Sequence, residues 1–404
     1  MEIVCFKKLK APSLAGAKPH LENPFHFPTS QIQTPTKPAK PMTRTKTAKL
    51  FFHFLLASLT LTFTACTDNS EPPRGRYERG VFILNEGAFG NGNGEVSFFD
   101  LDSNKVTNGI FGRENSGRPL GDVVQSMTIH ENAAYIVANN SNKLLVVDAQ
   151  TFKQTAEIAL RQPRYMVVQG TTGYVTEWVS NNFANPPKGR VAIINLQANT
   201  TAAQDTITTN GLFPDQLVLS GSRLYVLNSL ENTVSILNTQ TKAFEKKMVV
   251  GSGPSGMVLD RNNDLWIMAS GKADYSKFPM VATLEPGKLM RFRISGADLL
   301  LQGTFTFPAF GGGNLIANPA KDRLYYSFNG KVFDLAVSAS GLNTQPLIDR
   351  RFYGIGIDPA GTTFYGAVAP DFRSNGKMVR YSLSTKTALD SATVGIAPNG
   401  FVFR

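Results

Sequence analysis

Cysteine and histidine are scarce in this chain of 404 residues, and their scarcity excludes several classes of protein. Both cysteines, Cys5 and Cys66, precede the region that we expect to fold. That region therefore has no disulfide and must be stabilised by an apolar core. Of the four histidines, only His130 follows Cys66, so a histidine-based zinc site or a Ser-His-Asp triad is difficult to build. The chain after Cys66 also lacks any helical pattern of ten or more residues.

A short apolar segment, residues 50–65, ends at Cys66 and follows a basic stretch at residues 44–49. It is short for a membrane span and is followed by polar residues without a basic stop signal, which is typical of a secretory signal peptide. The alternative is a short buried helix ahead of the domain. We predict four regions: a disordered or mis-annotated extension over 1–41, a signal peptide over 42–65, a lipid-tethered linker over 66–80, and a folded domain over 81–404.

The residues around the cysteine, Phe63-Thr-Ala-Cys66, resemble a bacterial lipobox. The resemblance implies cleavage before Cys66, a lipid on its sulfur, and an exported protein anchored in the outer membrane. Acidic Asp68 and Glu71 favour the cell surface over the periplasmic side.

Most of the positive charge lies ahead of the predicted domain. Residues 1–65 hold nine of the 41 Lys and Arg and two of the 30 Asp and Glu, so they supply +7 of the net charge of +11. The rest of the chain has no basic run with interleaved aromatic residues. We therefore expect no binding to nucleic acid, although the whole chain is basic.

A motif of two short apolar strands recurs along the chain with a period of between forty and fifty residues. The strand that comes first in this two-strand motif carries an aromatic residue, as in Leu224-Tyr-Val-Leu-Asn228. The strand that follows it ends in Asp or Asn, as in Asn232-Thr-Val-Ser-Ile-Leu-Asn238. We count seven copies. Short strands, frequent turns and this period predict an all-β fold: a seven-bladed β-propeller of four-stranded antiparallel blades.

The two ends of the predicted domain complement each other. Residues 397–404 resemble the first strand of a blade, whereas the domain opens at residue 81 with a second strand. We therefore expect residues 399–404 to supply the inner strand of the blade that contains residues 81–111. Pairing of the first and last segments would close the ring and remove its open edges.

The repeated motif resembles the YVTN/YncE-like propeller repeat over most of residues 81–404. A narrower resemblance lies in Asn85-Glu-Gly-Ala-Phe-Gly90, Leu120-Gly-Asp122, residues 139–148 and Gln162-Pro-Arg-Tyr-Met-Val-Val168. These segments are similar to lipoprotein propellers that accompany TonB-dependent outer-membrane transporters, including the BtuG-type proteins that capture cobalamin. The resemblance implies a non-enzymatic, monomeric capture protein without a resident cofactor, whose ligand is cobalamin-like or another large polar molecule, and a transporter as partner.

Strand direction places the loop before each first strand and the loop between second and third strands on one face of the propeller. Rigid aromatic rings and adaptable amides on that face suit the capture of a polar ligand. Asn and Asp at strand ends also form turns, and the repeat tyrosines, such as Tyr225, are expected to pack between blades. The candidate ligand-binding residues are Arg164, Tyr165, Glu177, Trp178, Asp215, Gln216, Tyr275, Asn314 and Tyr353.

Two other functions remain open. Four carboxylates, Glu86, Glu177, Asp215 and Asp371, are placed to converge on a calcium ion at the channel mouth, which would suit a calcium-dependent, lactonase-like hydrolase. A purely structural surface protein is the other possibility. In each case the tether enters on the face opposite the candidate site, so the lipid would hold that site away from the membrane.

Overall fold

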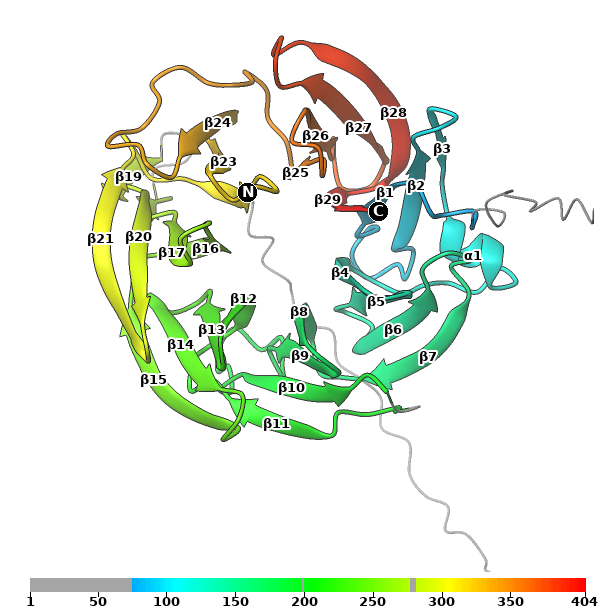
Figure 1. Ribbon diagram of the computed structural model, residues 1–404, viewed down its shortest axis with the longest axis horizontal. Helices are drawn as coiled ribbons and strands as arrows, with labels where there is room; N and C mark the ends of the chain where they lie inside the picture. Colours follow the sequence, from blue (N-terminus) through cyan, green and yellow to red (C-terminus); the bar gives the residue numbers. More distant parts are fainter. Residues whose placement is uncertain (1–74, 198–199, 277–280) are drawn as a thin grey trace, which may run out of the picture. The chain divides into compact units, whose positions relative to one another are not determined.

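The computed structural model describes residues 75–197, 200–276 and 281–404, so the predicted signal peptide, Cys66 and most of the linker lie outside the described residues. The described strands form seven antiparallel blades around a central channel, seen along its axis in Figure 1. From the channel outward, the blades are β29-β1-β2-β3 (Pro398–Phe403, Gly80–Asn85, Glu95–Asp100, Lys105–Thr107), β4-β5-β6-β7 (Val124–His130, Ala133–Ala138, Lys143–Asp148, Gln154–Ala159), β8-β9-β10-β11 (Pro163–Gln169, Thr172–Glu177, Arg190–Asn195, Asp205–Thr208), β12-β13-β14-β15 (Pro214–Ser220, Arg223–Asn228, Thr233–Asn238, Ala243–Val249), β16-β17-β20-β21 (Pro254–Leu259, Asp264–Ala269, Lys288–Ser295, Asp298–Thr306), β22-β23-β24 (Gly313–Ala317, Arg323–Phe328, Lys331–Ala336) and β25-β26-β27-β28 (Gly354–Ile357, Thr363–Val368, Asn375–Ser382, Ala388–Ile396).

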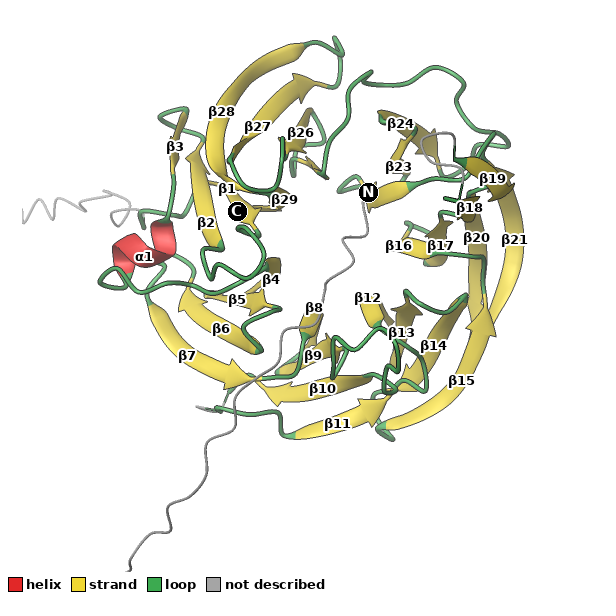
Figure 2. Ribbon diagram, turned by 180° about the vertical axis from the view of Figure 1, so that it is seen from behind, coloured by secondary structure: helices red, strands yellow, loops and turns green. Residues whose placement is uncertain are grey.

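The prediction of a seven-bladed, all-β propeller is confirmed. Six blades have four strands, and the blade of β22–β24 has three, with an isolated bridge between Val332 and Ile348 at the position of the fourth. A hairpin, β18 (Lys272–Asp274) and β19 (Ala282–Glu285), extends from the fifth blade. The described chain contains one helix, α1 (Ile110–Glu114), as Figure 2 shows. No helix among these residues has the length and apolar character that a membrane crossing requires.

The repeat aromatic residues pack between blades, as the sequence predicts. Tyr225, Trp266 and Tyr365 are almost completely buried in second strands of three different blades. Because side chains alternate along a strand, each second strand faces both neighbouring blades and reads as a nearly continuous apolar run. The core is thus divided into clusters between adjacent blades.

The ends of the domain close the ring, and this prediction is confirmed as well. Strand β29 pairs with β1 from Val81–Phe403 to Asn85–Pro398, and the backbones of Gly80 and Arg404 exchange two further hydrogen bonds. In Figure 1 the C-terminus therefore lies on the inner strand beside the first strand of the domain.

Residues 75–79, which the sequence assigned to the linker, pack against the propeller. Tyr77 is 1% exposed and contacts the rings of Phe82, Phe98 and Phe152, while its hydroxyl donates a 2.7 Å hydrogen bond to Glu114. The chain enters at the end of the blade where β29 finishes, opposite the end where β29 begins. The described chain thus approaches on the face predicted for the tether.

Candidate ligand-binding site at the channel mouth

The inner strands begin with an unusual backbone conformation. The residue just before six of these strands has a positive φ: Val123 (56°), Gln162 (49°), Phe213 (53°), Gly253 (65°), Gly312 (126°) and Ala397 (52°). Such angles are strained for residues other than glycine, most of all for β-branched valine. The repetition of this conformation at equivalent places around the channel indicates that the fold holds it in place.

Each of these conformations is followed by a β-bulge. In β12, for example, Pro214 pairs with Asn228 and Leu217 pairs with Val226, so two residues stand opposite one. A bulge interrupts the ladder and turns side chains in a new direction. The bulge at the start of β22 follows Gly312 and adds one residue, Asn314, which itself has a positive φ of 40°. The residues in the six bulges are Gln125, Arg164, Tyr165, Asp215, Gln216, Ser255, Asn314 and Asn399.

Five of the six bulges line a cavity of about 360 Å³ at the channel, and the exception is the bulge of β16, which contains Ser255. Its polar lining comprises Glu86, Gln125, Ser126, Thr128, Tyr165, Gln216, Asn314, Tyr353 and Asn399, and its apolar lining includes Leu84, Met127, Met166, Leu315, Ile355 and Phe401. Six blades contribute to this lining. A cavity of this size can hold a group as large as one sugar ring, so a larger ligand would extend beyond it onto the loops.

Arg164 is held by groups from three neighbouring blades. Its Nε and Nη2 each donate to a carboxylate oxygen of Asp215 at 3.3 Å, and its Nη1 donates to Gln125 Oε1. The guanidinium also lies 4.2 Å from the ring centroid of Trp178. The charge of Arg164 is therefore neutralised by Asp215 and its plane is supported by an aromatic face.

Thr176 connects two bulges. Its hydroxyl accepts a 3.1 Å hydrogen bond from the backbone N–H of Tyr165 and donates a 2.8 Å bond to the backbone carbonyl of Asp215. Thr176 is fully buried. Because bulged backbone groups lose their partners in the ladder, this hydroxyl replaces partners on two adjacent blades at once.

Glu86 joins the last blade to the closing strand. The hydroxyl of Tyr353 donates to its carboxylate at 3.0 Å, and Asn399 Nδ2 donates at 3.0 Å. Burial raises the pKa of Glu86, although these two hydrogen bonds and the positive charge of Arg164 oppose the shift. Burial and the neighbouring carboxylate likewise raise the pKa of Tyr353, and burial raises the pKa of Tyr165 to about 12. Both phenols therefore remain protonated donors at neutral pH.

The structure brings most of the predicted residues together. Tyr165, Gln216, Asn314 and Tyr353 line the cavity. Arg164, Asp215 and Trp178 contact one another or the lining, as described above. Trp178 also packs edge-on against Phe213, which stacks on the exposed ring of Phe183.

Two predicted residues lie elsewhere. Glu177 is 0% exposed, and its oxygens accept hydrogen bonds from Arg190 and from the backbone N–H of Arg161. It is a structural ion pair, since no surface is left for a ligand. Tyr275 is 58% exposed beside Phe310 in the hairpin region of the fifth blade, and it does not line the cavity.

The predicted convergence of four carboxylates on calcium is wrong. Glu177 is paired with Arg190, Asp215 with Arg164, and Asp371 accepts three hydrogen bonds from its own turn. Within residues 75–197, 200–276 and 281–404, no group of three or more His, Cys, Asp or Glu side chains is arranged to hold a metal ion. Of these four carboxylates, Glu86 alone lines the cavity.

Sequence reasoning missed Gln125 and Asn399 and considered Glu86 only as a calcium ligand. Asn399 follows a proline at the start of an inner strand, as do Arg164 and Asp215. The Pro-polar dipeptide was thus the available signal. Gln125 follows valine instead, and only the register shift reveals its position.

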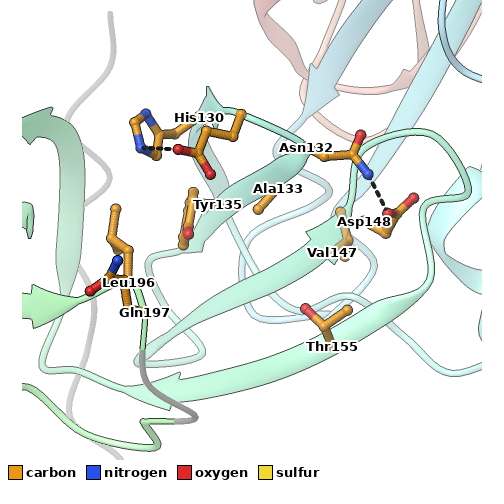
Figure 3. Close-up of a pocket in the computed structure, with 10 residues that line it drawn as sticks. His130, Asn132, Ala133, Tyr135, Val147, Asp148, Thr155, Leu196 and Gln197 are labelled. Atoms are coloured by element: carbon orange, nitrogen blue, oxygen red, sulfur yellow. Dashed lines mark hydrogen bonds and ion pairs between the residues drawn. The ribbon is translucent and has the colours of Figure 1, made fainter. Parts of the chain in front are cut away.

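A second cavity, of about 320 Å³, opens on the opposite face between the second and third blades (Figure 3). His130 ends β4 there, at the end of the strand away from the channel mouth, which agrees with its predicted face. Its Nε2 lies 3.9 Å from Glu131, and Asn132 donates a 2.7 Å hydrogen bond to Asp148. Of these two pairs, only Asn132 and Asp148 are joined by a hydrogen bond.

Comparison with solved structures supports the fold. The chain is similar to a quinonprotein alcohol dehydrogenase-like protein of Bacteroides thetaiotaomicron (13% identity, TM-score 0.59, 81% of this chain and 78% of that one). It is also similar to the periplasmic gluconolactonase of Pseudomonas aeruginosa (14%, 0.57, 80% and 99%) and to a candidate 6-phosphogluconolactonase of Bacteroides fragilis (14%, 0.56, 83% and 100%). At such identities the likeness concerns the fold alone.

No curated protein matches the sequence. A family model does match, over residues 79–368, which covers the propeller from its first strand to the second strand of its last blade. The chain therefore belongs to the family described as a domain of unknown function, DUF5074.

Proposed function

We propose that this propeller captures a polar ligand at the channel mouth without transforming it. The observation that carries this proposal is a set of five β-bulges, which present polar side chains from five inner strands toward one cavity. Strained backbone in proteins is concentrated at active sites and ligand-binding sites. The hydrogen bonds among Arg164, Gln125 and Tyr165 fix the side chains before a ligand arrives, which lowers the entropic cost of binding.

The cellular setting belongs to the same proposal. A lipid on Cys66 would anchor the protein in the outer membrane, and the chain reaches the propeller on the face opposite the cavity. The cavity would then face away from the membrane surface, toward incoming ligand or a TonB-dependent transporter. A cobalamin-like or other large polar ligand would place one group in the cavity and the rest on the surrounding loops.

The test of capture is direct binding. The full-length chain is mixed with a panel of corrinoids, siderophores and glycans, and its melting temperature is recorded. A ligand at one hundred times its Kd stabilises the fold by about 2.7 kcal/mol, which is readily detected. The capture proposal fails if no panel member shifts the melting temperature. The lipid anchor is tested by growing cells that produce the protein with a labelled fatty acid. We expect the wild-type protein to carry the label and a Cys66→Ala variant not to carry it.

One observation favours a second function, the hydrolysis of a sugar lactone. Glu86 has a raised pKa and lies in the cavity beside the hydroxyl of Tyr353, so it is suited to general acid or base work. A solved structure of similar fold is a gluconolactonase. Turnover of gluconolactone by the full-length chain, lost in a Glu86→Gln variant, would favour this function over simple capture.

A further inference from the structure

Besides the fully buried Asn399 Oδ1, which also lacks a partner, three hydrogen-bonding groups that line the cavity are not used by the fold. They are the amide nitrogen of Gln216, the carboxamide oxygen of Asn314 and the hydroxyl hydrogen of Tyr165. Within the part of the chain that the structure describes, none of the three has a hydrogen-bond partner. Two are donors and one is an acceptor.

The orientation of each amide follows from its other contacts. Gln216 Oε1 accepts a 2.9 Å hydrogen bond from the backbone N–H of Met257, so its nitrogen is the free atom. Asn314 Nδ2 donates a 3.2 Å bond to the backbone carbonyl of Tyr353, so its oxygen is the free atom. Rotating either amide by 180° would place two donors or two acceptors against each other. The pattern of donors and acceptor is therefore fixed.

The charges around the cavity disfavour an anionic ligand. No Lys or Arg of the described residues lines the cavity, and the nearby Arg164 is already paired with Asp215. Glu86 would repel an anion whenever it is ionised. A carboxylate or a fully ionised phosphate also has no hydrogen to give to Asn314 Oδ1, and an ammonium group cannot accept from Gln216 or Tyr165.

A hydroxyl group both donates and accepts, so a molecule with several hydroxyls can satisfy all three free groups. The apolar side chains of Met127, Met166, Leu315 and Ile355 also line the cavity and offer surface to the C–H groups of a ring. The volume of about 360 Å³ suits one ring of this kind.

We propose that the cavity takes an uncharged, hydroxyl-rich group of the neutral-sugar class, held by Gln216 Nε2, Asn314 Oδ1 and the Tyr165 hydroxyl. This inference rests on the proposed capture function and specifies the chemistry of its ligand. The recognised group can be a free sugar or a sugar residue of a larger ligand.

Matched probes test the class of ligand. Isothermal titration of the full-length chain compares the methyl glycosides of glucose, galactose and mannose with the corresponding uronates and amino sugars. We expect at least one neutral glycoside to bind about tenfold more tightly than its uronate and its amino sugar. Equal or tighter binding of the charged members, or no binding of any sugar, would overturn the inference. Binding of a corrinoid or siderophore in the melting-temperature panel would leave capture itself intact, whereas no binding of any compound in either experiment removes both proposals.

A single isosteric variant tests the donor. Gln216→Glu retains the oxygen that accepts from Met257 and replaces the free nitrogen by an acceptor. We expect it to weaken binding of the neutral glycoside at least tenfold with a nearly unchanged melting temperature. Gln197→Glu makes the same change at an exposed residue of the opposite cavity and should leave affinity unchanged. Should Gln216→Glu not fold, Tyr165→Phe removes one donor and is expected to weaken binding severalfold; unchanged affinity in the folded variant contradicts the proposal.

Discussion

The ion pair between Arg164 and Asp215 should be strongly coupled. Their side chains are 14% and 18% exposed, and two hydrogen bonds of 3.3 Å join them. Pairs on the surface contribute about 0.2–1 kcal/mol, whereas removal of one partner of a buried pair costs about 3–5 kcal/mol. This pair is much closer to the buried case, so we expect Arg164→Met and Asp215→Asn each to lower the free energy of unfolding by about 2–3 kcal/mol. Arg164→Met leaves the carboxylate of Asp215 without its partner, and Asp215→Asn leaves the charge of Arg164 without its partner.

The double variant is the decisive measurement. When both charges are removed, neither is left unpaired, so the double variant should be less destabilised than the sum of the singles by about 1.5–2 kcal/mol. Urea denaturation of the four proteins, followed by tryptophan fluorescence, gives the coupling energy from the midpoints if the m-values agree. Arg164→Lys is the control that keeps the positive charge without the planar guanidinium group, and it should recover only part of the lost free energy of unfolding. Additive single variants would refute the view that this pair holds the two bulges together.

Three further outcomes follow from the structure. Gly354→Ala should destabilise the fold by about 1–3 kcal/mol in urea, because its Cβ would lie 2.1 Å from the backbone oxygen of Asn399, while Gly341→Ala, with open space around it, should be neutral. Burial raises the pKa of Glu86 above 4.5, so above that pH the folded protein binds more protons than the unfolded chain, and the contribution of Glu86 to stability falls as the pH rises. The free energy of unfolding of the wild type relative to Glu86→Gln, measured in urea at pH 4, 5.5 and 7, should therefore decrease. A difference in free energy that does not change with pH would contradict the raised pKa. Deletion of residues 398–404 should abolish cooperative thermal unfolding, because β1 loses its inner partner; a native-like melting curve would show that the ring does not depend on this closure.

The fold could be predicted because it is encoded locally and repeatedly. Each second strand is an apolar run with an aromatic residue, such as Tyr225 or Trp266, and both are almost completely buried. A repeat that recurs seven times tolerates errors in any one copy. The closing strand could be predicted by the same logic. Pro398–Phe403 resembles the first strand of other blades, and the blade that opens the domain was the one blade without a first strand of its own.

The site could be predicted only in part because its residues are selected by a register shift. Five of the nine candidates, Arg164, Tyr165, Asp215, Gln216 and Asn314, are bulge residues, and the sequence located them through the turn before each inner strand. The sequence does not reveal whether a side chain beyond a strand end has a partner. Glu177 illustrates this, because its ion pair with Arg190 comes from the adjacent strand and is set by the cross-strand register.

The strained residues before the inner strands link the fold to the site. A left-handed residue followed by proline reverses the chain at Gln162-Pro163, Phe213-Pro214 and Ala397-Pro398, and the bulge comes next in each case. Proline fixes φ and offers no N–H, so the first ladder position of the strand is occupied by a residue that does not need a donor partner. The following residues then leave the ladder at little cost, because hydroxyls such as that of Thr176 serve their backbone groups. A Thr176→Val change should therefore loosen two bulges together and weaken ligand binding more than it weakens the fold, because the buried volume is conserved and the hydrogen bonds are not.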